Sequence, residues 1–167
     1  MDVLRHLPSP ISPTFSEALR IDTRAGSWVF IAGQVGVPLP PDKGSVTFEQ
    51  EVRTTFERIR DSLGKLGAGM NHVVSIKTYL TDLGPYAVFS RIRGEFFPKD
   101  PPTSTAVQVA GLLLNAKIEI DAVAFLPAVP PGESDSGRGV VDLANAGEFM
   151  ETRRRYDRLS PSVRPGS

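Results

Sequence analysis

The amino-acid sequence predicts an α+β fold in which two helices lie on one face of a mixed β-sheet. Short β-type runs and two helical segments follow one another in the order β-β-α-β-α-β-β, which favours that arrangement. The 167 residues, 40% hydrophobic and 23% charged, suffice for one core and are few for two. After Leu126, prolines, glycines and small polar residues bury too little surface to join the core. We therefore expect one domain at 1–126, a linker at 127–143 and a C-terminal tail at 144–167, in which 145–159 can form a short helix.

The first predicted element is a β-hairpin. Regular patterning begins at Ala18, where β-type runs at 18–22 and 28–33 flank a turn signal at 24–27. The proline- and glycine-rich stretch 34–45 then predicts a loop.

A helix with marked ends is predicted next. The Thr47 hydroxyl can cap its start while Gln50 completes a capping box, and Gly67 and Gly69 supply the stop. Its apolar residues recur at steps of three or four, so one stripe faces the core: Phe48, Val52, Phe56, Ile59, Leu63 and Leu66.

The second half of the domain predicts three strands and one helix. β-Branched and aromatic residues predict a strand at 72–81, and apolar residues at helical spacing predict a helix at 86–97. Pro98 closes that helix. Strands at 104–110 and 117–125 follow, the second with clean polar–apolar alternation.

Composition and charge argue against several classes of protein. The 19 basic and 19 acidic residues cancel, so no summed field attracts nucleic acid or a membrane. The one basic cluster, Arg153 to Arg155 with Arg158, has acidic neighbours, and we expect it to be solvated or to bridge subunits. Without a signal peptide, a membrane-spanning run or cysteine, a cytoplasmic protein is expected. His6 and His72 lie far apart, so no metal site is expected.

Several short segments occur together in a distinctive order and spacing. They are Phe30 to Gly36 (FIAGQVG), the helix from Phe48, Tyr79 to Asp82 (YLTD), Phe96-Phe97, Pro102, Val107 to Ala110 (VQVA) and Ile118 to Ala122 (IEIDA). Through them the run from Val29 to Phe125 resembles the Rid family of reactive intermediate deaminases, also called YjgF or endoribonuclease L-PSP proteins.

The resemblance implies a chorismate-mutase-like homotrimer with a central barrel of sheets, helices outside, and small-molecule sites between neighbouring subunits. Independently, a sheet with one helix-covered face must hide its other face from water, which a closed symmetric oligomer does. The resemblance further implies hydrolysis of 2-enamine and 2-imine acids, with no cofactor.

The resemblance also implies which residues form the site. Glu119 takes the place of a glutamate that helps to orient water, and we expect it to be catalytic; the alternative is a solvated carboxylate on an alternating strand. Gly33 and Gln34 lie where the family places backbone near the ligand. For Gly33, backbone geometry after a strand is an equal and compatible explanation.

One expected group is missing. Ser104 replaces the family's carboxylate-binding arginine, and a hydroxyl cannot act as a charged, bidentate donor. Three further substrate-binding positions hold Phe15, Ser90 and Ala106, which predicts a more apolar cleft.

Arg91 is the candidate for a substitute cation. Arg91 and Arg93 lie two residues apart on the second helix, so at most one of them faces the cleft. The alternative is that both are solvated on the outer face of the helix.

The leading prediction is a hydrolase, specifically a deaminase. Its substrate is an imine or enamine that does not make the usual carboxylate contact with the protein. A trimer that binds a small ligand without turnover, or regulates through it, is the first alternative. An RNA-cleaving or translation-inhibiting protein is the second.

Overall fold

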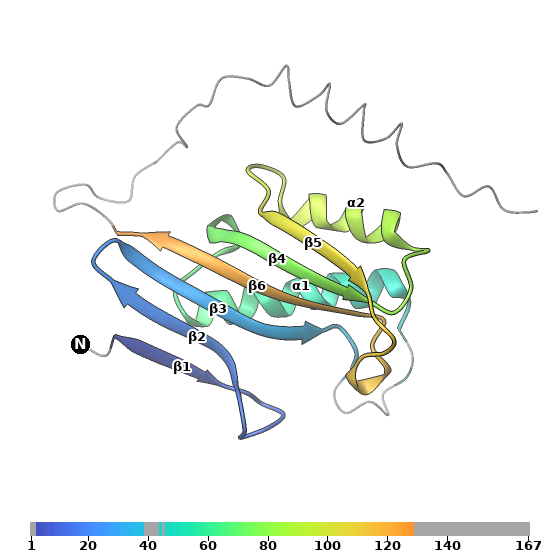
Figure 1. The fold of residues 1–167 in the computed structure, drawn as a ribbon, viewed down its shortest axis with the longest axis horizontal. Coiled ribbons are helices and arrows are strands. Elements are labelled where there is room, and N and C mark those ends of the chain that lie inside the picture. Colours follow the sequence, from blue (N-terminus) through green and yellow to red (C-terminus); the bar gives the residue numbers. More distant parts are fainter. Residues whose placement is uncertain (1–2, 39–43, 45, 129–167) are drawn as a thin grey trace, which may run out of the picture. The chain divides into compact units, whose positions relative to one another are not determined.

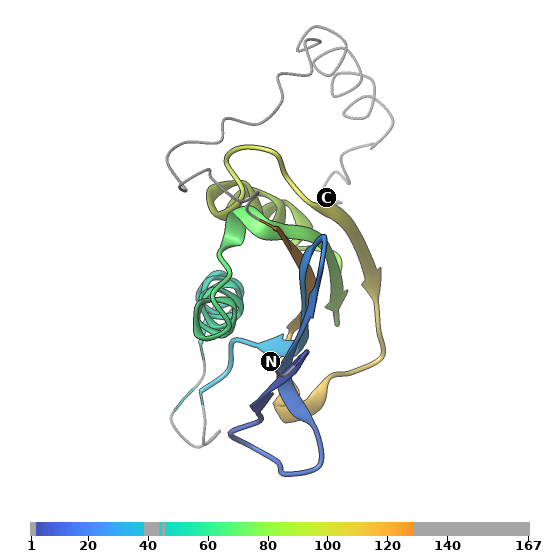
Figure 2. The same ribbon diagram turned by 90° about the vertical axis from the view of Figure 1, so that its left-hand side faces the viewer.

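The computed structural model describes residues 3–38, 44 and 46–128. They form one six-stranded mixed sheet with two helices on one face, as Figures 1 and 2 show, which confirms the predicted α+β fold. Apart from residues 127 and 128, the predicted linker and tail lie outside the described residues, and so do the proposed helix at 145–159 and the arginine cluster at 153–158.

The described elements follow the predicted order with one addition at the start. In chain order they are β1 (Leu4–Pro8), β2 (Ser16–Thr23), β3 (Gly26–Val35), α1 (Phe48–Lys65), η1 (Met70–His72), β4 (Val73–Leu80), α2 (Tyr86–Phe96), β5 (Thr103–Gln108), η2 (Leu113–Asn115) and β6 (Ile118–Pro127). The sheet order is β1-β2-β3-β6-β4-β5. Among the described strands only β4 and β5 run parallel, and α2 makes the crossover between them.

β1 is the strand that the sequence analysis missed. It pairs with β2 in antiparallel register at the edge of the sheet, with Arg5 opposite Arg20. Of its five residues only Leu7 is partly buried, so β1 lacks the alternation of buried and exposed side chains that predicts a strand. Backbone hydrogen bonding at an open edge therefore makes a strand that side-chain patterning does not predict.

The two ends of α1 are built as the sequence predicts. The Thr47 hydroxyl accepts a hydrogen bond from the Gln50 N–H, and the Gln50 side chain accepts one from the Thr47 N–H at 2.9 Å. At the other end Gly67 adopts φ +76°, and the Ala68 N–H donates to the Leu63 carbonyl at 2.9 Å. This is a Schellman stop, which uses the freedom of glycine at positive φ.

The core fills the space between the helices and one face of the sheet. Phe56 of α1 is fully buried and stacks on Phe96, with ring centroids 4.9 Å apart, while Phe89 and Phe97 complete the cluster. These contacts pack α2 against α1. The helix-facing residues Ile76 and Leu80 of β4 and Ile118 and Ile120 of β6 belong to the same core.

The opposite face of the sheet has no helical layer among the described residues (Figure 2). On β3, Trp28 and Phe30 are 39% and 41% exposed and alternate with buried Val29 and Ile31. Further along β4 and β6 the same face becomes polar, with Lys77, Tyr79, Glu119 and Asp121. No helix in the described part of the chain is long and apolar enough to span a membrane.

Candidate functional site

Glu119 projects from β6 onto the sheet face that lacks helices. Its neighbours Ile118 and Ile120 are fully buried in the core, and side chains alternate along a strand. The carboxylate lies against Gly33 of β3, where a Cβ atom would collide with Glu119 Oε1. Because φ of Gly33 is not in the left-handed region, close approach of the carboxylate explains this glycine better than a backbone requirement.

The surroundings of Glu119 favour its protonated form. Burial raises the pKa of Glu119, and the charge of Asp121 raises it further. Asp121 accepts a hydrogen bond from the Tyr79 hydroxyl at 3.0 Å, and Tyr79 lies opposite Glu119 in the sheet register. A carboxylate with a raised pKa accepts a proton more readily, so Glu119 is suited to draw one from water. Tyr79 and Asp121 were not predicted as site residues, although strand alternation places both on the same face as Glu119.

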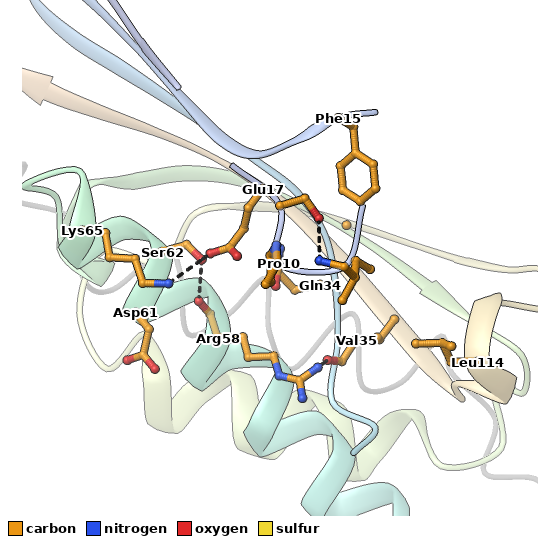
Figure 3. Close-up of a pocket in the computed structure, with 13 residues that line it drawn as sticks. Pro10, Phe15, Glu17, Gln34, Val35, Arg58, Asp61, Ser62, Lys65 and Leu114 are labelled. Atoms are coloured by element: carbon orange, nitrogen blue, oxygen red, sulfur yellow. Dashed lines mark hydrogen bonds and ion pairs between the residues drawn. The ribbon is translucent and has the colours of Figure 1, made fainter. Parts of the chain in front are cut away.

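Gly33 and Gln34 also line a hollow of about 240 Å³ together with Phe15. Figure 3 shows this hollow with Phe15 and Gln34 on one side and α1 on the other. Arg58 of α1 donates to the carbonyl groups of Val35 and Val37, at 2.5 and 2.9 Å. That arginine fixes the backbone that follows Gln34.

The buried carboxylate at the base of the hollow, that of Glu17, is paired with other side chains of the chain. Glu17 accepts a 2.5 Å hydrogen bond from the Ser62 hydroxyl and lies 3.5 Å from Lys65 Nζ. These groups hold β2 against α1. No sequence pattern predicts this contact, because Glu17 and Ser62 meet only through tertiary packing.

A second group of predicted residues lies around β5 and α2. Arg93 Nη1 donates to Ser104 Oγ at 2.9 Å, and its Nη2 donates to Ser90 Oγ at 3.3 Å. Ala106 packs against the core from the same side of β5, opposite Thr78 in the register. Ser90, Ser104 and Ala106 are therefore brought together, with the guanidinium of Arg93 between the two serines.

Glu119 and the group around Ser104 lie on opposite sides of the sheet. Ser104 points toward α2, whereas Glu119 points away from the helices. Strand β4 also separates β6 from β5. One small molecule therefore cannot touch Glu119 and Ser104 of the same chain.

Arg93 and not Arg91 is the cation next to Ser104. Arg91 donates to both Glu49 and Glu95 at 2.9 Å, and Arg53 pairs with the same two carboxylates. Ser90 and Arg93 are three positions apart, so they share a face of α2. The prediction that Ser90 lies in the cleft therefore implied that Arg93, and not Arg91, faces the cleft as well.

Comparison with known proteins agrees with this architecture. The family described as Endoribonuclease L-PSP matches residues 7–126. A RutC family protein of Pyrococcus abyssi is 31% identical over 121 residues, covering 71% of this chain and 90% of that protein. The chloroplastic Reactive Intermediate Deaminase A of Arabidopsis thaliana is 32% identical over 123 residues, covering 71% of this chain and 62% of that protein.

Solved structures give the same result. A member of the YjgF/YER057c/UK114 family from Mycobacterium tuberculosis superposes with a TM-score of 0.63 at 25% identity, covering 74% of this chain and 99% of the other. RidA from an Antarctic Psychrobacter superposes with a TM-score of 0.62 at 26% identity, covering 75% and 100%. The sequence match and the shared chorismate-mutase-like fold show that this chain belongs to the endoribonuclease L-PSP family, the family of the YjgF and RidA proteins.

Proposed function

We propose that the protein hydrolyses a small imine or enamine in a cleft between two copies of the chain. The observation that carries the proposal is Glu119, a half-buried carboxylate with a raised pKa that lies against Gly33 on the uncovered sheet face. A second copy packed on that face brings its own Ser90 and Ser104 toward the first copy's Glu119, which completes a site that one chain leaves divided. In this proposal the copies form a closed trimer, which would also cover the exposed Trp28 and Phe30.

The chemistry needs one water and no redox step. Glu119 takes a proton from water as the water oxygen bonds to the imine carbon, and the C=N bond becomes a C–N single bond. The nitrogen takes that proton back from Glu119. Glu119 then removes the proton of the new hydroxyl group and passes it to the nitrogen as the C–N bond breaks, so a carbonyl compound and ammonia leave and the carboxylate is restored. An enamine first takes a proton on carbon and gives up one from nitrogen to become the imine. Backbone around Gly33 and Gln34 orients the substrate for this step.

Ammonia release tests the proposal directly. The full chain is supplied with freshly generated 2-aminoacrylate and with imines of larger, uncharged carbonyl compounds. The wild type is expected to accelerate hydrolysis, and Glu119→Gln to slow it about 10²- to 10⁴-fold through loss of the proton acceptor. Glu57→Gln, which removes an exposed carboxylate of α1, is the control and should match the wild type. Equal rates for Glu119→Gln and the wild type would contradict the proposal.

Ser104 favours a second candidate, a trimer that binds a ligand without turnover, because β5 itself supplies no cation. In that case the wild type binds imine analogues yet releases no ammonia from any substrate tested. Ser104→Arg would then gain activity on 2-aminoacrylate.

A further inference from the structure

We propose that Arg93 is the carboxylate-binding residue of the site, placed there by Ser90 and Ser104, so that the ligand is a small organic acid. The inference rests on the proposed cleft for its location. It does not require turnover, because a cation that binds a carboxylate does so whether or not a reaction follows. It replaces the expectation from the sequence that the cleft lacks such a contact.

The first support is that the guanidinium of Arg93 has no carboxylate partner among the described residues. The four side chains Glu49, Arg53, Arg91 and Glu95 form a closed ion-pair network with two charges of each sign. Arg93 has no carboxylate within ion-pair distance among the described residues; its hydrogen bonds go to two neutral hydroxyls. A half-buried guanidinium without a counter-ion attracts an anion.

The second support is that the guanidinium is held in place. Arg93 Nη1 and Nη2 are each tied to a serine, and the guanidinium carbon lies 5.2 Å from the centre of the Phe89 ring, whose side chain is fully buried. Since a guanidinium has more N–H groups than these two hydroxyls use, a pair remains for the two oxygens of a carboxylate. A fixed fork loses little side-chain entropy when it binds a ligand.

The third support is location. The guanidinium meets Ser104 at the outer edge of the sheet, because β5 is the last strand. Ser104 is exposed, so a ligand can reach the pair from solvent or from a neighbouring copy. The cation thus belongs to the group of residues that faces a partner's Glu119 in the proposed cleft.

The test compares acids with their amides. Pyruvate and phenylpyruvate, each paired with its neutral amide, are titrated into the full-length protein by calorimetry. The wild type is expected to bind at least one acid more tightly than its amide, and Arg93→Gln to weaken that acid about 10- to 100-fold while leaving the amide unchanged. Arg91→Gln removes the same charge two residues away and is the matched control; it should keep the preference for the acid.

Each outcome decides the question. Wild type that prefers no acid over its amide, or Arg93→Gln that keeps the preference, overturns the inference. If Arg93→Gln fails to fold, Arg93→Lys keeps the charge but not the fork, and its preference for the acid should fall; an unchanged preference overturns the inference in the same way. A protein that releases no ammonia yet shows the Arg93-dependent preference contradicts only the proposed catalysis, and ammonia release from 2-aminoacrylate that is insensitive to Arg93→Gln contradicts only this inference.

Discussion

The carboxylate of Glu119 occupies the space that Gly33 leaves by having no side chain. The two residues come from neighbouring strands, β6 and β3, where the register shifts between Ile31 and Gln34. An irregular stretch of β3 therefore makes room for the one carboxylate that the proposed chemistry needs.

Gly33→Ala should displace that carboxylate without unfolding the protein. The new methyl group must push the Glu119 side chain away, since φ at position 33 is one that alanine tolerates. We expect the rate of ammonia release to fall toward that of Glu119→Gln. Gly64→Ala in α1 meets no atom within 4 Å and is the control; it should keep full activity and gain about 0.5–1 kcal/mol in unfolding free energy. Full activity in Gly33→Ala would contradict the assigned role of Glu119.

The rate of ammonia release should fall as pH drops through the raised pKa of Glu119, because the ionised form is the proton acceptor. Asp121→Asn removes the nearby negative charge, which lowers the pKa of Glu119 and moves the acid limb of the pH–rate profile to lower pH. Tyr79→Phe leaves the charge of Asp121 in place, so its acid limb should move less. If Asp121→Asn does not move the acid limb of the pH–rate profile, that limb reports the ionisation of a group other than Glu119.

Glu119→Gln should be more stable than the wild type at neutral pH. A carboxyl group whose pKa is raised on folding stabilises the folded state while it is protonated, below its ordinary pKa. That contribution is lost as pH rises through the raised value, whereas glutamine loses nothing. Thermal unfolding should therefore show a gap between the two proteins at neutral pH that closes in acid. A gap that is independent of pH would rule out this origin.

Phe30→Glu should break the assembly of copies. Phe30 is 41% exposed on the uncovered sheet face, and a charge buried there between subunits would be unpaired. Leu83→Glu makes a similar change at 42% exposure between β4 and α2, outside the strands, and serves as control. Sedimentation should show a smaller species for Phe30→Glu alone. An oligomer of wild-type size in Phe30→Glu would mean that this face is not the interface.

Thr78→Val should stabilise the fold by about 1 kcal/mol, because the Thr78 hydroxyl is buried without a hydrogen-bond partner among the described residues. Thr55 is equally buried, but its hydroxyl donates to the Glu51 carbonyl at 2.8 Å. Thr55→Val should instead cost about 0.5–1.5 kcal/mol. Urea unfolding of both variants measures the contrast, and a loss of stability in Thr78→Val would indicate a partner for that hydroxyl.

Local patterns were enough for most of the elements. The capping box at Thr47, the stop at Gly67 and the alternation along β6 each depend on residues close together in sequence, and each is confirmed. β1 was missed because an exposed edge strand buries too little to leave a pattern.

The sequence by itself determined which residue types are present: a glutamate at 119, and a serine at 104 where an arginine was expected. Only the tertiary structure decided which of them meet. The sheet register sets Glu119 against Gly33, and the packing of α2 turns Arg93, not Arg91, toward Ser104. The physical reason is that periodicity reports how each residue is buried within its own element, whereas contacts between elements depend on how their faces pack.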